Sequence, residues 1–436
     1  MTIRKRLSLA LVCLATLALN ACGGDGGESG ADPRIRLLNL STGYTSLDMM
    51  TNLDSDEDDD DETQADGVAL EAVSEYATLD PDDYTVKVRR TGSGSVLRSF
   101  AGEQLVEDTI NTYVAYGEVG NFGALRIDDT LDEADAGETK LAVANVSSAG
   151  ALDIYLTDPN TDLDDTTPVL SSVGAALAPL STDSGTYRLR VTAAGDSADV
   201  RLDVASFVLT DRGVISLILT STQGGMLANA LVLPQEGQPT KINNTKARVR
   251  GAVGLSNGAN ATIQVGGQSV LTAATAGVIG SRYTLLDAGS VPVTLVVNGT
   301  AVAVPNVNLA AGADYTLLVW SNAGGAQSSL IVDDNRLPSG GTAMAKLRLL
   351  NGMSTLAAPL TLSVDFSPVI EGTLLGQASD EIEIASGTDR LFDVANTSTA
   401  QNVLTRGSIT LQGNSVYTFF MTDNGATAIG VLRRDR

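Results

Sequence analysis

The chain repeats itself with a period of roughly 100 residues. A strand-like segment of basic and apolar residues occurs four times, at residues 34–39, 140–145, 246–250 and 346–351. A repeat of this length is too long for a solenoid unit, which has about 20 to 50 residues, and it matches the size of an independent domain. The 436 residues also exceed what one hydrophobic core usually serves. The repeat therefore predicts four tandem domains.

The pattern within each repeat favours β-structure. Short runs rich in Val, Leu, Ile and Thr alternate with polar residues, which is the period of a half-buried strand. Asn298-Gly299 separates two such runs and suits a tight hairpin turn. We therefore expect an all-β fold of four tandem antiparallel β-sandwich domains. We expect the connections, such as residues 235–244 and 337–342, to let the domains flex. The expected domains are residues 34–135, which contain an acidic loop, and residues 139–236, 246–336 and 343–436.

The first residues are typical of a targeting segment. Basic residues at positions 4–6 precede an apolar run, residues 7–19, that is too short to span a bilayer as a mature helix. The run leads into Ala21-Cys22, which resembles the lipobox of bacterial lipoproteins, whose cysteine is acylated and begins the mature chain. We expect a lipoprotein signal peptide at residues 1–21, lipid on Cys22, and a flexible, glycine-rich tether at residues 22–33. The alternative is an ordinary signal peptide with a chance cysteine.

The resemblance to lipoproteins also implies a location. A non-acidic residue after the acylated cysteine, here Gly23, implies the outer membrane, and the periplasmic and surface faces both stay open. No other stretch approaches the length of a transmembrane helix, so the expected contact with the membrane is the N-terminal lipid. The sequence therefore predicts an outer membrane lipoprotein of the cell envelope.

Composition argues against several functions. The net charge of -24 disfavours binding to nucleic acid and to anionic lipid surfaces. The chain has no histidine, which removes the usual general base near neutral pH and the commonest transition-metal ligand. Aromatic residues make up only 4%, whereas sugar-binding platforms usually need exposed rings. Cys13 lies in the expected signal peptide, so the mature chain is expected to fold without a disulfide.

An acidic block stands out between Asp54 and Glu62, where eight of nine residues are Asp or Glu. Such a block stays extended and solvated, which favours a solvated insertion loop. Carboxylates are also the ligands that Ca²⁺ takes, and the matching loop of the second domain is acidic too. The block does not fit an EF-hand loop. The candidate Ca²⁺ ligands are Asp54, Asp56, Glu57, Asp58, Asp59, Asp60, Asp61, Glu62, Asp158, Asp162, Asp164 and Asp165.

Two of the strand-like segments resemble a known family. Residues 34–39 and Leu152-Asp153-Ile154-Tyr155 are similar to the strands of the bacterial domain of unknown function 4397, a β-sandwich-like module found in tandem on secreted and envelope proteins. The third repeat lacks both the Asn that ends the opening strand and the Asp-Tyr element. The resemblance extends over residues 34–434 through spacing and strand order. It implies framework strands, and it implies no reaction and no active site.

These observations predict a non-catalytic, lipid-anchored cell-envelope protein that acts as a spacer or interaction module. The expected partner is an envelope protein or polysaccharide, and no catalytic residue is predicted. No cofactor is expected apart from Ca²⁺. Three alternatives stay open: a hydrolase of envelope polysaccharide that uses an Asp/Glu pair, a Ca²⁺-dependent adhesion module, and a solute-binding lipoprotein, which tandem small repeats with few aromatic residues make less attractive.

Overall fold

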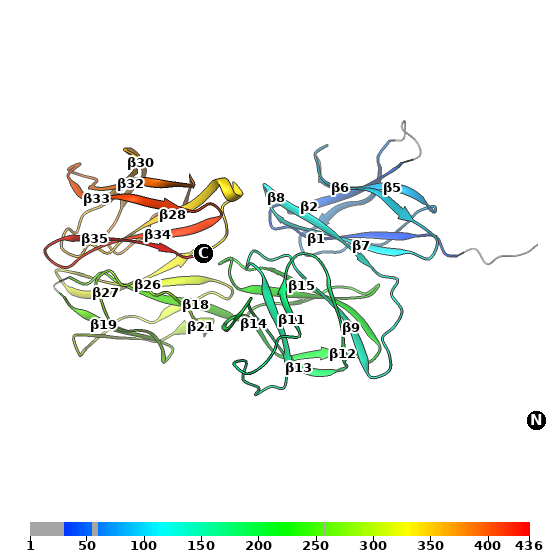
Figure 1. Ribbon diagram of the computed structural model, residues 1–436, viewed down its shortest axis with the longest axis horizontal. Coiled ribbons are helices and arrows are strands. Elements are labelled where there is room, and N and C mark those ends of the chain that lie inside the picture. Colours follow the sequence, from blue (N-terminus) through cyan, green and yellow to red (C-terminus); the bar gives the residue numbers. More distant parts are fainter. Residues whose placement is uncertain (1–29, 55–59, 257) are drawn as a thin grey trace, which may run out of the picture.

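Figure 1 shows the computed structural model of the protein, which describes residues 30–54, 60–256 and 258–436. Strands and the turns between them make up these residues, in four successive units that we number from the N-terminus. Units 1 and 2 form the right half of Figure 1, and units 3 and 4 form the left half. The predicted all-β fold of four sandwich-like units is confirmed.

The strands of unit 1 are β1 (Arg34–Leu40), β2 (Ser46–Leu53), β3 (Glu62–Ala69), β4 (Ala77–Thr78), β5 (Asp82–Arg90), β6 (Val96–Leu105), β7 (Ile110–Glu118) and β8 (Asn121–Asp128). Those of unit 2 are β9 (Glu138–Asn145), β10 (Leu152–Thr157), β11 (Leu170–Val173), β12 (Ala178–Asp183), β13 (Gly185–Ala193), β14 (Asp196–Leu209), β15 (Gly213–Ser221), β16 (Ala228–Pro234) and β17 (Thr240–Ile242).

The strands of unit 3 are β18 (Lys246–Val253), β19 (Asn260–Val265), β20 (Gln268–Thr275), β21 (Thr284–Asp287), β22 (Gly289–Val291), β23 (Val293–Val297), β24 (Thr300–Val302), β25 (Val307–Leu309), β26 (Asp314–Asn322) and β27 (Gly325–Asp333). Unit 4 has a 3-10 turn, η1 (Gly341–Ala343), and the strands β28 (Met344–Asn351), β29 (Leu360–Val364), β30 (Ser367–Thr373), β31 (Ile382–Ala385), β32 (Gly387–Asn396), β33 (Asn402–Leu411), β34 (Ser415–Asp423) and β35 (Ala428–Arg434).

Two main sheets with a repeated strand order make up every unit. The sheet that contains the first strand of the unit, which we call the pairing sheet, has the orders β4-β1-β7-β8, β12-β9-β15-β16-β17, β21-β18-β26-β27 and β31-β28-β34-β35. The other sheet, which we call the outer sheet, has the orders β3-β2-β5-β6, β11-β10-β13-β14, β20-β19-β23-β24 and β30-β29-β32-β33. In unit 3, β22 and β25 form an additional small sheet. One hydrophobic core lies within each unit.

Each pairing sheet contains one parallel strand pair, which the sequence patterns do not indicate. In unit 1, β1 and β7 run parallel from Arg34 opposite Ile110 to Leu40 opposite Tyr116. The pairs β9 and β15, β18 and β26, and β28 and β34 repeat this arrangement. The chain builds the outer sheet between these two strands and then returns in the same direction, so the two strands are parallel. All the other strand pairs in the described residues are antiparallel.

The units pack in pairs through the outward faces of their pairing sheets. Between units 1 and 2 the buried cluster comprises Leu38, Leu40, Val114, Ile127, Ile218, Leu231 and Leu233. Between units 3 and 4 it comprises Ala252, Ile279, Leu318, Leu350 and Phe420. Figure 1 shows the two pairs side by side, with unit 1 above unit 2 and unit 4 above unit 3. The pairing sheets are therefore covered on both faces.

The connections that were expected to flex make hydrogen bonds with neighbouring strands and loops. The side chain of Asn244, in the connection between units 2 and 3, is buried and donates to the carbonyl oxygens of Arg201 and Ala228 at 2.7 and 2.9 Å. In the connection between units 3 and 4, the N–H of Ser339 donates to Glu383 Oε1 at 2.7 Å. The predicted flexing of the domains about these connections stays a prediction. Within the described ranges, no helix has the length and apolar character that crossing a membrane requires.

Candidate functional site

Several of the residues singled out from the sequence lie outside the described part of the chain. These are the predicted lipidation site Cys22 and four of the predicted Ca²⁺ ligands, Asp56, Glu57, Asp58 and Asp59. Their predicted roles therefore stay predictions.

The described ends of the acidic block are attached to neighbouring strands. Asp54 accepts hydrogen bonds from Thr85 Oγ1 at 2.6 Å and from the N–H of Gly102 at 3.0 Å. Asp61 pairs with Lys87 Nζ at 2.5 Å and also with Arg89. Both carboxylates are thus engaged by the protein itself, whereas Asp60 and Glu62 are exposed.

The acidic loop of unit 2 is likewise exposed, with Asp162 accepting the N–H of Asp164 at 3.1 Å. Asp158 and Asp165, also in this loop, are exposed. Among the described residues, no three acidic side chains gather into a group that could hold a metal ion. The structure therefore does not bring the described candidate ligands together.

The recurrent Asn at the end of the opening strand in units 1, 2 and 4 is a structural residue. The side chain of Asn39 donates to the carbonyl of Val68 at 3.0 Å and accepts the N–H of Ser41 at 3.0 Å. Asn351 makes the same two kinds of bond, to the carbonyl of Thr373 and from the N–H of Met353. These amides link the first strand of the unit to the outer sheet and fix the turn that follows.

The Asp of the Leu-Asp-Ile-Tyr element has a similar role. Asp153 is buried, and its two oxygens accept the N–H groups of Ser172 and Gly195, both at 2.8 Å. These residues lie on the two sides of β10, so the carboxylate fastens the neighbouring strand and turn to it. The motifs that carry the family resemblance are therefore framework elements, as the resemblance implies.

A buried charged group lies on the pairing sheet of unit 1. Arg36 Nε donates to Thr112 Oγ1 at 2.7 Å, and Thr112 in turn donates to Asp129 Oδ2. The Tyr76 hydroxyl donates to the same oxygen at 3.0 Å, and its ring lies 4.4 Å from the Arg36 guanidinium. Arg36, Thr112 and Asp129 are each at least 98% buried. We call these four residues the Arg-Thr-Asp-Tyr group.

The same group recurs in unit 3. Arg250 Nε donates to Thr316 Oγ1 at 2.9 Å, and Thr316 and Tyr283 both donate to Asp333 Oδ2 at 2.7 Å. The guanidinium of Arg250 lies 4.9 Å from the centre of the Tyr283 ring. The strand register is also the same, because Arg36 lies opposite Thr112 and Arg250 lies opposite Thr316.

Unit 4 keeps the arginine, the threonine and the aspartate. Arg348 lies opposite Thr418 and donates to its hydroxyl at 2.9 Å, and Thr418 donates to Asp435 Oδ2 at 2.5 Å. Glu381 lies 3.5 Å from the Arg348 guanidinium. A positively charged side chain is therefore buried at this place in three of the four described units.

The arginines of units 3 and 4 each reach across to the other unit. Arg348 Nη2 donates to Asp333 Oδ1 at 2.6 Å, and Arg250 Nη1 donates to Asp435 Oδ1. The side chains of all four residues are at most 3% exposed. Charged hydrogen bonds formed away from water are strong, and each ion here has an opposite charge as its partner. The interface between units 3 and 4 is thus held by two reciprocal ion pairs.

Unit 2 has lost this group. Ala142 stands where the arginine would be, because it lies opposite Ser216 in the same register. Gln235, two residues after Leu233, takes the place of the aspartate, since Leu233 lies opposite Ser216. Neutral residues therefore replace the charged group in this one unit.

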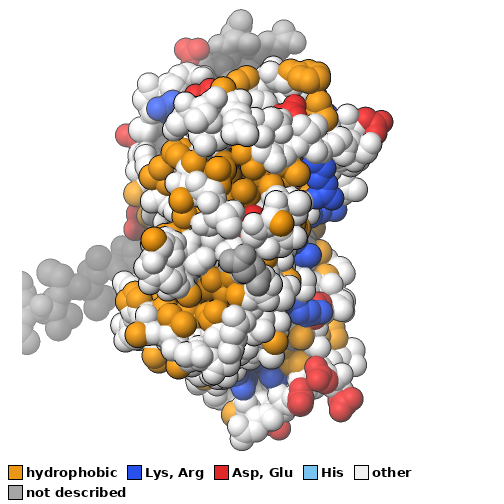
Figure 2. All heavy atoms as spheres, turned by 90° about the vertical axis from the view of Figure 1, so that its left-hand side faces the viewer, with side chains coloured by type: hydrophobic (Ala, Val, Ile, Leu, Met, Phe, Trp, Pro, Cys, Tyr) orange, Lys and Arg blue, Asp and Glu red, His pale blue; other side chains and the backbone are white. Residues whose placement is uncertain are grey.

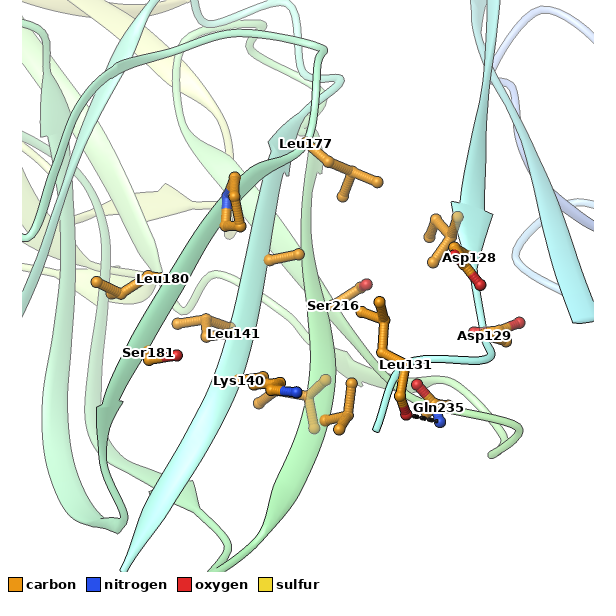
Figure 3. A pocket seen from close by; sticks show the side chains of 15 residues that line it. Asp128, Asp129, Leu131, Lys140, Leu141, Leu177, Leu180, Ser181, Ser216 and Gln235 are labelled. Atoms are coloured by element: carbon orange, nitrogen blue, oxygen red, sulfur yellow. Dashed lines mark hydrogen bonds between the residues drawn. The ribbon is translucent and has the colours of Figure 1, made fainter. Parts of the chain in front are cut away.

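A cavity of about 600 Å³ lies between units 1 and 2 at the place of the missing arginine. Ala142, Ser216 and Gln235 all line it, together with Asp129 from the end of unit 1. Figure 3 shows Asp129 on the unit 1 side of the cavity and Lys140 and Ser216 on the unit 2 side. The rest of the lining is mainly apolar, with Leu131, Leu177, Pro179, Leu180 and Val214 among the residues.

Asp129 differs from its counterpart Asp333 in one respect. Both accept hydrogen bonds from Thr and Tyr on Oδ2, but only Asp333 has an arginine of the partner unit on Oδ1. No hydrogen bond or ion pair to Asp129 Oδ1 is found among the described residues, although Asp129 is only 2% exposed. Arg36, its charged neighbour, lies 3.6 Å from Oδ2.

The pKa values of Asp129 and Asp333 are shifted in opposite directions. Burial raises the pKa of Asp129, and Thr112 and Arg36 lower it by less. Burial acts on Asp333 in the same direction, but Arg348 and Arg250 outweigh it and hold the pKa of Asp333 below its ordinary value. A nearby cation favours the ionised form of a carboxyl group. The cavity therefore contains a buried carboxyl group with room for a cation beside it.

Sequence reasoning missed this cavity. The signal was present in the aligned opening strands, where Arg36, Arg250 and Arg348 correspond to Ala142. Whether an alanine at this position leaves a cavity depends on which units pack against each other. The pattern of residues along the sequence does not give the packing of one sheet on another.

The fold and the cavity place the chain among all-β proteins built from tandem sandwich units that pair through their sheets. Residues 33–155, which comprise unit 1 and the start of unit 2, match the model of the family described as "Domain of unknown function (DUF4397)". The resemblance proposed from the strand openings is confirmed there. A search of curated proteins found no match.

Comparison with solved structures found similarities at very low identity. A carbohydrate-binding module of family CBM26 from Eubacterium rectale Amy13K, in complex with maltoheptaose, is 9% identical, with a TM-score of 0.16; the match covers 46% of this chain and 96% of that one. The Bacillus anthracis TIE protein is 9% identical, with a TM-score of 0.15; the match covers 92% of this chain and 76% of that one. Similarities this weak carry no argument about function.

Proposed function

We propose that the protein is a non-catalytic lipoprotein of the cell envelope whose four-unit body acts as an interaction module or spacer. Lipid on Cys22 anchors it to the outer membrane, and residues 22–33 connect the lipid to the body. An envelope protein or polysaccharide is the proposed partner. The basis for the anchor is the leader sequence that ends at Cys22.

The observation that supports the spacer role is the use of the buried charges to join units. Arg250 and Arg348 pair with Asp435 and Asp333 across the interface between units 3 and 4, so these charges join units together. Edge strands of the outer sheets, such as β6 and β33, carry many exposed side chains that a partner could contact. Phe366, at the turn between β29 and β30, is 81% exposed. Figure 2 shows hydrophobic side chains at the surface of one face of units 3 and 4. Exposed apolar groups of this kind favour contact with another macromolecule.

The anchor is tested with a pair of cysteine variants expressed in the native host. Cys22→Ala should lose incorporation of labelled fatty acid and leave the membrane fraction, whereas Cys13→Ala, the matched control, should keep both. If Cys22→Ala is labelled and sediments like the wild type, the lipid anchor at this residue is wrong.

The non-catalytic role is tested with purified protein and isolated envelope polysaccharide. We expect no new reducing ends over hours of incubation, whether or not the polysaccharide co-sediments with the protein. Release of reducing ends that disappears on replacement of a single Asp or Glu would identify the hydrolase alternative instead.

A further inference from the structure

We propose that the cavity between units 1 and 2 binds a small organic cation, with a guanidinium head group donating to Asp129 Oδ1 and an apolar body lying against unit 2. This inference goes beyond the proposed function and is independent of lipid on Cys22. It rests on the comparison of two equivalent interfaces in the same molecule.

The interface between units 3 and 4 shows how a guanidinium fits this place. Arg348 comes from unit 4, donates to the carbonyl oxygen of Val332 at 3.0 Å, and donates to Asp333 Oδ1 at 2.6 Å. In the interface between units 1 and 2, Asp128 and Asp129 take the places of Val332 and Asp333, and Ala142 takes the place of Arg348. Asp128, Asp129 and Ala142 line the cavity together. The interface between units 1 and 2 therefore keeps the hydrogen-bond acceptors but has no arginine to donate to them.

The acceptors in the cavity are held ready for a donor. Thr112 and Tyr76 both donate to Asp129 Oδ2, which fixes the carboxyl group and leaves Oδ1 for a ligand. Gln235 Oε1 is buried and has no hydrogen-bond partner among the described residues, while its amide group donates to the carbonyl of Leu131 at 2.8 Å. A buried acceptor without a donor is unfavourable, so a bound donor would be stabilised at this place.

The charges of the lining also favour a cation. The Lys140 ammonium, the one cationic group that lines the cavity, donates to the carbonyl of Asp132 at 2.9 Å. Arg36 donates from Nε to Thr112 and from Nη1 to the carbonyl of Gly237 at 2.8 Å, and its Nη2 lies 3.6 Å from Asp129 Oδ2. Two carboxylates, Asp128 and Asp129, line the cavity, and the neighbouring Arg36 pairs with Asp129 through Oδ2. A planar guanidinium suits a carboxylate and a neighbouring carbonyl, as Arg348 shows.

The size of the cavity calls for more than a head group. Its volume of about 600 Å³ lies within the range of small-molecule sites, about 300 to 1,000 Å³, and far exceeds one guanidinium. Leu131, Leu177, Pro179 and Leu180 form apolar walls that a hydrocarbon or aromatic body would cover. Burial of that body contributes roughly 25 cal/mol per Å² of apolar surface removed from water. The ligand class is therefore a guanidinium on an apolar body.

The test uses the full mature protein and isothermal titration calorimetry with benzylguanidine as the probe. Benzyl alcohol, which has the same ring without the charge, and guanidinium itself separate the two parts of the ligand. We expect one benzylguanidine site per chain, with at least tenfold weaker binding of either half alone. No heat with benzylguanidine, or equal binding of benzyl alcohol, would overturn the proposal.

Two variants locate the site. Asp129→Asn keeps the shape of the side chain and removes its charge, and Ala142→Arg places a guanidinium in the cavity from the protein itself. Each should weaken benzylguanidine binding at least tenfold, while the control Asp287→Asn, on an exposed side chain of unit 3, should bind like the wild type. If Ala142→Arg does not fold, the isosteric Asp129→Asn decides alone. Wild-type affinity in Asp129→Asn would exclude this cavity.

Discussion

At the residue scale, the four units differ mainly in whether a buried arginine is present at one position of the opening strand. Arg36, Arg250 and Arg348 are nearly inaccessible to water, and each has hydrogen-bond partners for its guanidinium. A buried charge is tolerated only when it is paired, and removing one partner leaves the other uncompensated. Ala142 shows that the unit also folds without the charge when small neutral residues replace the whole group.

The first prediction concerns Arg250, which is 1% exposed. Arg250→Ala leaves Asp435 without its partner in the other unit, so it should lower the free energy of unfolding by about 3–5 kcal/mol, measured by urea denaturation. The control is Arg282→Ala, because the Arg282 side chain is 71% exposed and pairs with Asp196 at the surface. That control should change stability by less than about 1 kcal/mol. Equal effects of the two variants would contradict the structural role of Arg250.

The second prediction concerns pH. Burial raises the pKa of Asp334, but hydrogen bonds from Arg336 and Lys346 outweigh it and lower the pKa to about 2. A carboxyl group whose pKa is lower in the folded protein stabilises it above the pKa of the unfolded chain, and this contribution is lost as pH falls through the folded pKa. Wild-type stability should therefore decrease between pH 4 and pH 2. Asp334→Asn should show a smaller decrease over this interval in urea unfolding, and an unchanged pH profile would refute the assignment.

At the scale of the element, the opening strands are covered on both faces. In β1 every residue after Arg34 is buried, because one face meets the core of unit 1 and the other meets unit 2. The same holds for β18, where Lys246 is followed by buried residues alone. A strand with one wet face alternates between polar and apolar residues, whereas a strand buried on both faces does not, and the polar side chains that it contains, such as Arg36 and Arg250, are paired inside the protein. This explains why the repeat is most visible in these segments.

The third prediction tests the contact between units 1 and 2. Leu38 is fully buried in that interface, so Leu38→Ala should cost about 2–5 kcal/mol of unfolding free energy, through lost contacts and the cavity left behind. Val208→Ala, at a side chain that is 58% exposed, is the matched control and should be near neutral. Thermal and urea unfolding measure both. A near-neutral Leu38→Ala would mean that the sheets do not pack on each other in solution.

The elements show where sequence reasoning succeeds and where it stops. Period-two runs and turn residues such as Asn298-Gly299 predicted strands and hairpins, and β23 and β24 pair around that turn. Those signals are local, so they indicate neighbours that a short turn can join. The parallel pairing of β1 with β7 brings together residues far apart in the chain, and no local pattern encodes it. The cavity was missed for the same reason, because Asp129 and Ala142 belong to different units.

At the scale of the whole molecule, the protein is built from two pairs of units. Units 1 and 2 share one hydrophobic interface, and units 3 and 4 share another that also contains two ion pairs. Contacts between the pairs are more polar, such as Arg248 with Asp199 at 3.6 Å and the N–H of Gly224 with the carbonyl of Gly312 at 3.0 Å. The pair is therefore the cooperative building block that we expect.

The last prediction follows from this division. A fragment of residues 246–436 keeps the interface between units 3 and 4, so it should fold on its own and unfold in one cooperative transition. A fragment of residues 343–436 exposes Leu350 and Phe420 and leaves Arg348 without Asp333, so it should be less stable or aggregate. Circular dichroism during thermal unfolding compares the melting temperatures of the two fragments. The Arg348→Ala substitution should destabilise the longer fragment far more than the shorter one, because only the longer fragment contains Asp333. Equal melting temperatures of the two fragments would show that each unit is stable alone and that the interface contributes little.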